Sequence, residues 1–390
     1  MNKQPDFDQL INRRGTHSIK WDRYGEDILP MWVADMDFRS PQPVIEALQK
    51  KVSHGIFGYP FIDDQTLETI KIWIQRAYHW KVNPEDIVLM PGVVTGLNLA
   101  AQTVSRPGES LLIQTPVYGP FHHVAENAGL RQLDSPLLYD KHTGYSIDFD
   151  HFRETLREDT RLFLLCNPQN PTGRVFDKNE LEQIAQICMK NGTVICSDEI
   201  HCDLVYSNAN HIPIASLSPE IAQQTITLIA PSKTFNIAGL KASIAIIPNK
   251  ELREKFITAK RGLVGWINTL ALTAMIAAYT NGDTWLESLL KYLEANRDYL
   301  EKYLRQNLPE LAFVKPQGTY LAWLDCSSLG LDVPPSDFFL QQAKVAMNDG
   351  AWFGDNGKDF VRLNFGCPRK TLDRALGRIH EAVEVLRSGK

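Results

Sequence analysis

Five short apolar runs that alternate with amphipathic stretches constrain the fold of this chain more than any other feature. Runs of this length are typical of strands buried in a parallel sheet, and their alternation with helical stretches is typical of an α/β protein. Because ligands of open α/β sheets bind beyond the carboxyl ends of the strands, we expect a site where these runs end. The runs lie at residues 87–90, 111–114, 162–166, 193–196 and 226–230.

Length and charge limit the class of protein. The chain has 390 residues and a formal net charge of −5, so it is long enough for a large core and, we expect, two domains. The mildly acidic balance gives no general attraction to nucleic acid or anionic lipid. No apolar stretch is long enough to span a bilayer, and residues 1–6 lack the apolar core of a signal peptide. We therefore expect a cytoplasmic protein with no nucleic-acid or membrane partner.

The cysteines exclude two kinds of site. They form no CxxC pair, so the sequence predicts neither a zinc ribbon nor a redox motif, and no metal site. Several lie in apolar runs, where buried free thiols are the ordinary interpretation, in agreement with a reducing compartment. The six are Cys166, Cys188, Cys196, Cys202, Cys326 and Cys367.

The pattern changes after residue 247 and predicts a second, smaller domain. Residues 285–304 have leucines at the spacing of a long amphipathic helix. Two strands are predicted at 318–324 and 360–365, and a final helix at about 372–386. We expect a large domain with a mainly parallel central sheet, and a smaller α+β domain. The large domain would span 49–284, and the small domain would combine 1–48 with 285–390.

Polar or aromatic residues follow the apolar runs. Lys233 comes where the last strand is expected to open into a loop, and an amine there can be desolvated, lose its proton and attack a carbonyl. Asp198, Asn170, Tyr118 and the turn at 92–95 follow the other runs. Taken singly, these features are consistent with a surface lysine, a helix N-cap, turns and a core aromatic ring. Five of them at strand ends favour one shared site instead.

One cofactor, pyridoxal 5′-phosphate (PLP), needs all five features. Its aldehyde reacts with a lysine amine, and a buried aspartate keeps its pyridine nitrogen protonated, which makes the ring an electron sink. An amide can donate to its phenolic oxygen, and an aromatic side chain can stack on its ring. Backbone N–H groups at a helix N-terminus can hold its phosphate. We therefore predict that the chain binds PLP.

Three motifs resemble those of a known family. They are NPQNPTG at 167–173, SDEIH at 197–201 and SKTFNIAG at 232–239. Together and in this order they resemble fold-type I PLP enzymes of the class I/II aminotransferase group. The resemblance covers nearly the whole chain and implies the PLP-dependent transferase-like fold.

Within that group, the chain most resembles the MalY/PatB branch of cystathionine β-lyases, which are cysteine-S-conjugate β-lyases. The branch-level motifs are MWVADMDF at 31–38, GIFGY at 55–59, DEIH at 198–201 and VRLNFGCPR at 361–369. Many aminotransferases carry a tyrosine where this chain has His201, so His201 agrees with the lyase-like branch. Alternatively, His201 is a structural histidine.

The resemblance gives roles to the residues around the cofactor ring. Lys233 would form the Schiff base, and Asp198 would pair with the pyridine nitrogen. Asn170 would donate to the phenolic oxygen, with His201 nearby, and Tyr118 would stack on the ring.

The resemblance also implies a phosphate site and a substrate site. Lys241 stands where many aminotransferases have arginine, so it keeps the charge but not the forked geometry. Tyr59 would reach the phosphate bound to the other subunit of a homodimer. Arg362 would bind the substrate carboxylate as a fork, with Ala34 also in the substrate site. The remaining phosphate contacts would come from Val93, Val94 and Ser232, with Thr95 beside them.

The implied reaction is the cleavage of a carbon–sulfur bond. Lys233 would remove the Cα proton as a general base, and a thiolate would leave Cβ, so that cystathionine or another S-conjugate yields a thiol, pyruvate and ammonia. Transamination uses the same residues, so no residue separates the two reactions. A regulatory protein that only holds PLP is a third alternative, but the motifs begin at about Met31, which leaves little room for a DNA-binding helix-turn-helix.

Overall fold

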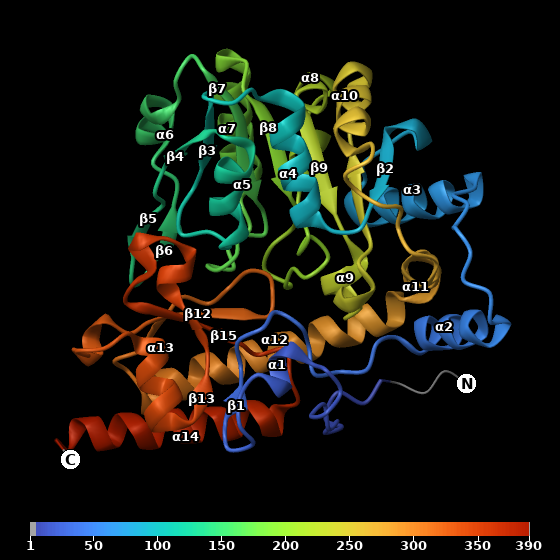
Figure 1. Ribbon diagram of the computed structural model, residues 1–390. Helices are drawn as coiled ribbons and strands as arrows, with labels where there is room; N and C mark the ends of the chain where they lie inside the picture. Colours follow the sequence, from blue (N-terminus) through green and yellow to red (C-terminus); the bar gives the residue numbers. More distant parts are fainter. Residues whose placement is uncertain (1–4, 390) are drawn as a thin grey trace.

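The computed structural model describes residues 5–389 and has a seven-stranded sheet at the centre of its upper part in Figure 1. Residues 1–4, the start of the segment considered above as a signal peptide, and residue 390 lie outside the described residues. The strands of this sheet are β2 (Ile87–Met90), β3 (Ser110–Ile113), β4 (Arg131–Asp134), β7 (Thr160–Cys166), β8 (Val194–Asp198), β9 (Thr225–Ile229) and β10 (Ser243–Ile246).

The direction of the strands brings their ends together. The order is β2-β10-β9-β8-β7-β3-β4. β3, β4, β7, β8 and β9 are parallel, and β10 is antiparallel to both of its neighbours, so β2 points the same way as the parallel strands. The five apolar runs of the sequence form β2, β3, β7, β8 and β9, and the predicted α/β fold with a mainly parallel sheet is confirmed. Their carboxyl ends therefore share one edge of the sheet.

Helices cover both faces of this sheet, which explains why its strands are apolar throughout. α4 (Val93–Val104), α5 (Pro120–Ala128) and α10 (Lys250–Lys260) share a core with one face. α6 (Phe149–Thr155), α7 (Lys178–Asn191) and α8 (Pro219–Gln223) share a core with the other. α4 lies close to the sheet because Gly96 has no side chain: a Cβ there would lie 2.8 Å from Cε of Met90. Because α4 begins at Val93, soon after β2 ends at Met90, its N-terminus lies at the carboxyl edge of the sheet.

A four-stranded antiparallel sheet lies below, in the C-terminal part of the chain (Figure 1). Its strands, in spatial order, are β11 (Ala312–Phe313), β12 (Leu321–Asp325), β15 (Phe360–Asn364) and β14 (Asn348–Asp349). The two predicted helices are present as α12 (Asp283–Asn307) and α14 (Arg369–Arg387). β12 begins at Leu321 rather than at 318, because Thr319 has a φ of 67°, a left-handed conformation that interrupts an extended strand. The division into domains stays a prediction.

The N-terminal segment joins the two parts. β1 (Leu29–Pro30) pairs in parallel with β13 (Val345–Ala346) of the C-terminal part. Among residues 5–389, no helix has the length and apolar character needed to cross a membrane. The remaining helices and strands are α1 (Ile19–Asp22), α2 (Gln42–His54), α3 (Asp64–Tyr78), β5 (Leu138–Asp140), β6 (Gly144–Ser146), α9 (Pro231–Thr234), α11 (Thr269–Asn281) and α13 (Pro335–Phe338).

Candidate active site

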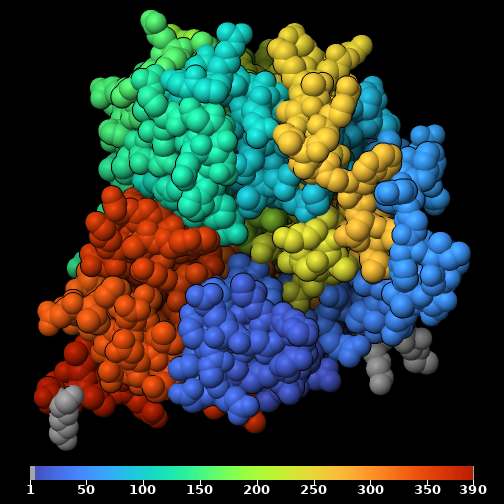
Figure 2. All heavy atoms as spheres, viewed as in Figure 1, coloured from blue at the N-terminus to red at the C-terminus, as the bar shows by residue number. Residues whose placement is uncertain are grey.

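A cavity of about 200 Å³ lies where the strand ends meet the N-terminal segment. In Figure 2, the yellow segment around α9 is visible in a recess between the upper part and the blue N-terminal segment. Eleven of the residues that the sequence places at the site line the cavity, whereas Tyr59 and Arg362 do not. The eleven are Ala34, Val93, Val94, Thr95, Tyr118, Asn170, Asp198, His201, Ser232, Lys233 and Lys241.

Lys233 lies in α9, a single helical turn, and not in the loop that the sequence predicts. Pro231 begins this turn, where the N–H that proline lacks is not needed. The Nζ atom of Lys233 donates a hydrogen bond to the carbonyl of Ala34 at 2.7 Å. Burial lowers the pKa of Lys233 to about 8, with an opposing effect from the carboxylate of Asp35. A fraction of the amine is therefore neutral near pH 8. The neutral form is the one that acts as a nucleophile or base.

Asp198 is the last residue of β8 and is only 5% exposed. Its Oδ1 accepts the backbone N–H of Ile200 at 3.0 Å, and no helix follows it directly in the described chain, so the N-cap interpretation is wrong. Burial raises the pKa of Asp198 to about 7, while the bond from Ile200 lowers it. A cationic group in the cavity would favour the ionised carboxylate.

Arg362 lies immediately behind the cavity wall, with a 2% exposed side chain. Its Nη1 donates to Oδ1 of Asn170 and its Nη2 to the carbonyl of Trp32, each at 3.0 Å. Within residues 5–389 its Nε has no hydrogen-bond partner and no carboxylate forms an ion pair with it. Burial lowers the pKa of Arg362 to about 10, so the guanidinium remains charged at neutral pH. A buried cation without an anion is costly, and this indicates an anionic ligand.

Tyr118 and Asn170 form the wall next to Arg362. The backbone N–H of Tyr118 donates to the carbonyl of Asn170 at 3.1 Å, and the Tyr118 ring packs edge-on against Trp352 at 5.2 Å. Burial raises the pKa of the Tyr118 phenol. Because the amide oxygen of Asn170 accepts from Arg362, its NH₂ group is left as the donor of this side chain.

The far end of the cavity has the features of an anion site. α4 begins there, and the first N–H groups of a helix, at Val93 and Val94, have no partner within the helix and carry partial positive charge. The Ser232 hydroxyl and the Lys241 ammonium belong to residues that line the same cavity. This combination of donors fits a phosphate group.

His201 is buried, and its Nδ1 has no hydrogen-bond partner in the described part of the chain. Burial holds the pKa of His201 well below its ordinary value, and the charges of Lys233 and Arg362 act in the same direction. The imidazole is therefore neutral at physiological pH. It brings an unsatisfied polar atom to the cavity wall.

Sequence reasoning missed the charged residues that hold the segment containing Ala34. The fully buried Lys20 donates to Oδ2 of Asp37 at 2.9 Å and to the carbonyl of Asp35 at 3.1 Å. Arg13 donates to both carboxylates at 2.7 Å. The two aspartates of MWVADMDF, Asp35 and Asp37, could have indicated such a network. Sequence reasoning used this motif only for the family resemblance.

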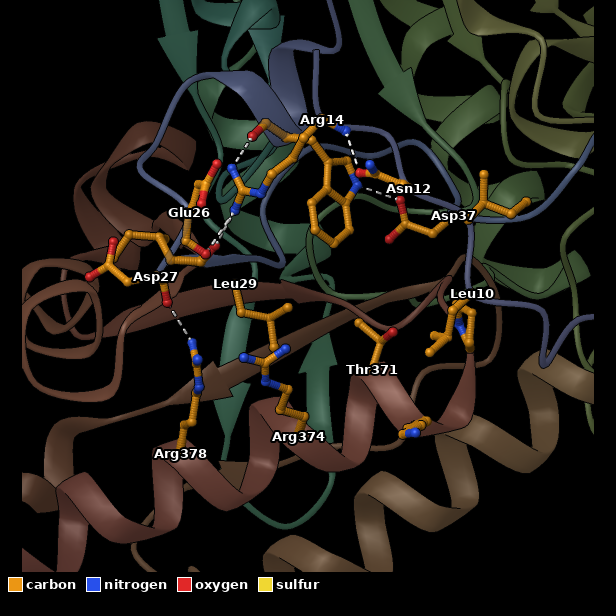
Figure 3. A pocket seen from close by; sticks show the side chains of 15 residues that line it. Leu10, Asn12, Arg14, Glu26, Asp27, Leu29, Asp37, Thr371, Arg374 and Arg378 are labelled. Atoms are coloured by element: carbon orange, nitrogen blue, oxygen red, sulfur yellow. Dashed lines mark hydrogen bonds between the residues drawn. The ribbon is translucent and has the colours of Figure 1, made fainter. Parts of the chain in front are cut away.

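A second cavity, of about 380 Å³, lies between the N-terminal segment and α14. Figure 3 shows Arg14 and Asp37 among its lining residues. Asp37 also accepts a hydrogen bond from Nε1 of Trp21 at 2.8 Å there. Arg14 donates to backbone carbonyls, including that of Trp21 at 2.7 Å. Of these bonds, the one from Trp21 reaches the segment that contains Ala34, whose carbonyl accepts from Lys233.

Tyr320 is a further residue that sequence reasoning missed. It is buried, and its hydroxyl donates to the carbonyl of Ala34 at 2.9 Å, next to the bond from Lys233. The ring of His201 lies edge-on to that of Tyr320 at 5.9 Å. Tyr320 followed Thr319 inside a predicted strand, and nothing in that pattern pointed to the cavity.

Tyr59 lies away from the cavity of its own chain and is 94% exposed. Ile56, Phe57 and Phe61 beside it are also exposed. The structure of one chain therefore does not bring Tyr59 to the other predicted site residues.

Comparison with known proteins places this geometry in a family. The model of the family "Aminotransferase class I and II" matches residues 26–379. The chain belongs to the aminotransferase class I and II family. Cystathionine β-lyase PatB of Bacillus subtilis is 44% identical, over 97% of this chain and 100% of PatB. Protein MalY of Escherichia coli is 35% identical, over 98% and 100% of the two chains.

A solved structure agrees with this membership. The PLP-bound C–S lyase of Staphylococcus hominis superposes with a TM-score of 0.91 at 34% identity, covering 97% of this chain and 98% of the lyase. The predicted resemblance to the class I/II group and its MalY/PatB branch is confirmed, and so is the fold-type I architecture.

Proposed function

We propose that this chain is a PLP-dependent carbon–sulfur β-lyase that converts cystathionine or another cysteine S-conjugate into a thiol, pyruvate and ammonia. One observation carries the proposal: the amine of Lys233, with its pKa lowered to about 8, and the buried carboxylate of Asp198 line one cavity. The 44% identity to a cystathionine β-lyase supports the choice of reaction. When bound, PLP supplies an electron sink for negative charge at the substrate Cα.

The residues of the cavity fit PLP at both ends. The N-terminus of α4, Ser232 and Lys241 would hold the phosphate. At the other end, a protonated ring nitrogen would satisfy the Asp198 carboxylate, whose charge is otherwise disfavoured by burial. The NH₂ group of Asn170 and the unpartnered Nδ1 of His201 are the polar groups available to the ring oxygen. Tyr118 would lie against the ring face.

Arg362 binds the substrate, and Lys233 removes its proton. The guanidinium of Arg362 binds the α-carboxylate, which supplies the anion that this buried cation lacks. With the carboxylate held, the neutral amine of Lys233 takes the Cα proton. The carbonyl of Ala34, which accepts from Nζ at 2.7 Å, orients the amine before the proton moves. The electron pair at Cα then forms a double bond to Cβ as the bond between Cβ and sulfur breaks and the thiolate leaves. Water hydrolyses the remaining unsaturated amine to pyruvate and ammonia.

The test is a product assay on the purified holoenzyme. Cystathionine, cysteine and other β-substituted amino acids are supplied one at a time, and pyruvate and thiol are measured. The proposal expects the two products in equal amounts from at least one sulfur substrate. A parallel reaction contains the amino acid and a 2-oxo acid acceptor. Transfer of the amino group without pyruvate or thiol release would establish transamination and overturn the proposal.

We also propose that the enzyme is a homodimer in which Tyr59 contacts the phosphate bound to the partner subunit. An exposed row of apolar residues needs a covering surface, and this row is formed by Ile56, Phe57, Tyr59 and Phe61. The mass of the protein in solution is measured by light scattering at the concentration of the activity assay. A monomer with full activity would contradict the dimer and the role of Tyr59.

A further inference from the structure

The helical turn that carries Lys233 is too short to be stable by itself. α9 has four residues, and its helical hydrogen bond runs from the N–H of Phe235 to the carbonyl of Pro231 at 2.9 Å. A single turn fixes several backbone dihedrals in return for one hydrogen bond, so isolated turns are unfavourable. The position of the Lys233 amine therefore depends on the groups that α9 contacts.

Asp203 makes a polar contact with α9 at Thr234, whereas the Lys233 amine contacts Ala34. Its Oδ2 accepts the hydroxyl of Thr234, the residue after Lys233, at 2.6 Å. Its Oδ1 accepts Nε1 of Trp73 at 3.3 Å and the hydroxyl of Tyr78. One carboxylate thus joins α9 to α3, and it belongs to the loop that starts at Asp198.

The hydrogen bond that Thr234 donates to Asp203 has features of a strong bond. Thr234 is fully buried, so its hydroxyl has no solvent to replace a lost acceptor. Burial raises the pKa of Asp203, and the bonds from Thr234, Tyr78 and Trp73 oppose that rise by stabilising the ionised form. A hydrogen bond to an ionised acceptor is about twice as strong as one between neutral groups.

Apolar side chains also pack next to α9, but this packing does not fix the rotation of the helical turn. Phe235 is buried and packs edge-on against Trp73, with 5.5 Å between ring centroids. Trp73 in turn stacks on Tyr279 at 4.9 Å. Ring contacts of this kind tolerate small rotations, whereas a 2.6 Å hydrogen bond to a fixed carboxylate does not.

We propose that Asp203 is a positioning residue that, through Thr234, holds α9 so that the Lys233 amine points at the substrate Cα. The Ala34 carbonyl then holds the amine of Lys233, and Asp203 holds α9 through the hydroxyl of Thr234. The inference rests on the proposed role of Lys233 as the cofactor-linked base. It does not depend on whether the proton transfer leads to elimination or to transamination.

The experiment compares four variants of the full-length holoenzyme: Asp203→Asn, Thr234→Val, Thr234→Ser and Tyr78→Phe. Thr234→Val removes the donor while keeping the shape of the side chain, and Thr234→Ser keeps the donor. Tyr78→Phe is the matched control, because it removes a hydrogen bond to the same carboxylate without touching α9. Each variant is measured for the pH midpoint of the visible cofactor absorbance, cofactor affinity, kcat, KM and melting temperature.

We expect Asp203→Asn and Thr234→Val to move the pH midpoint by about half a unit or more, since the environment of the lysine nitrogen changes. We expect kcat to fall by about 10- to 100-fold in both, because a small displacement of a reacting group has effects of this size, with a smaller change in KM. Thr234→Ser should restore the behaviour of the natural protein. Tyr78→Phe should leave the pH midpoint in place even where it lowers the melting temperature.

Two results would overturn the inference. One is a Thr234→Val enzyme with an unchanged pH midpoint and kcat. The other is a Tyr78→Phe enzyme whose pH midpoint shifts as far as that of Thr234→Val, since the shift would then not report the contact between Thr234 and Asp203. If Asp203→Asn does not fold, the two Thr234 variants decide alone. Failure of the proposed lyase function is seen separately, in the products of the unaltered enzyme, because the absorbance midpoint is independent of the products.

Discussion

The two walls of the active-site cavity differ in how their charges are paired. On the strand-end wall, Lys233 and Asp198 form no ion pair within residues 5–389, and both pKa values are displaced toward neutrality. Ala34 forms the N-terminal wall, and next to it in the chain Asp35 and Asp37 form a closed network with Lys20 and Arg13. A buried charge without a partner is costly until a ligand or a proton satisfies it, whereas a paired one becomes costly only when its partner is removed. The contrast separates the groups that do chemistry from those that hold the cavity in place.

The largest effect expected from this comparison is the loss of turnover in Lys233→Ala. Removal of the base should lower pyruvate release by about 1,000-fold or more and abolish the absorbance of the lysine-linked cofactor. The matched control is Lys260→Met, because Lys260 is also partly buried and also donates to a backbone carbonyl, that of Leu89 at 2.7 Å. The control should keep its turnover. Unchanged turnover in Lys233→Ala would remove Lys233 from the mechanism.

Substitutions in the charged network of the N-terminal segment should lower the stability of the fold. Lys20→Met leaves the buried Asp37 carboxylate with fewer partners, and we expect the free energy of unfolding to fall by about 3–5 kcal/mol. Lys255→Met breaks the exposed pair with Glu251 and should change it by less than about 1 kcal/mol. Urea unfolding of the cofactor-free proteins measures both. If the two variants lose the same stability, the network does not act as a scaffold.

Asp198→Asn should raise the free energy of unfolding rather than lower it, because it removes a buried charge that has no ion-pair partner. The folded pKa of about 7 exceeds the unfolded value of 3.8, so the carboxyl contributes stability at low pH that is lost as the pH rises from about 4 to 7. The cofactor-free variant should therefore be more stable than the natural protein by about 2–4 kcal/mol at pH 8, with a smaller gain at pH 5. Urea unfolding at the two pH values measures this. A variant that is less stable at pH 8 would show that Asp198 has a structural partner.

The smallest effect is expected for Arg362→Lys, because this substitution keeps the positive charge of the side chain. Arg362→Lys loses the forked contact with a carboxylate, and we expect KM to rise by about 10- to 100-fold with a smaller change in kcat. Steady-state kinetics with cystathionine measures it. A substrate analogue without the α-carboxylate should bind the natural protein and the variant with equal affinity. Equal KM values for cystathionine would place its carboxylate elsewhere.

Local patterns were sufficient to predict five strands of the central sheet and the residues at their ends, but not β4 and β10. A buried parallel strand must be apolar throughout, so the five runs were visible, and the residues that follow them share one edge of the sheet. The same local rule misplaced the start of β12, because the left-handed conformation of Thr319 is set by its tertiary surroundings. It also described α9 as a loop, because one turn of helix leaves no periodic signal.

The sequence by itself determined the class of fold and the PLP cofactor, and it predicted Lys233, Asp198 and Asn170 as site residues because each of them follows a recognisable strand. Only the tertiary structure placed Arg362 against Asn170, Tyr320 at the carbonyl of Ala34, and Asp203 behind Thr234. These partners are far apart along the chain, and a hydrogen bond between them depends on the path of the backbone in space. The residues that we propose to react thus follow recognisable strands, whereas the residues that we propose to position them became visible only in the folded chain.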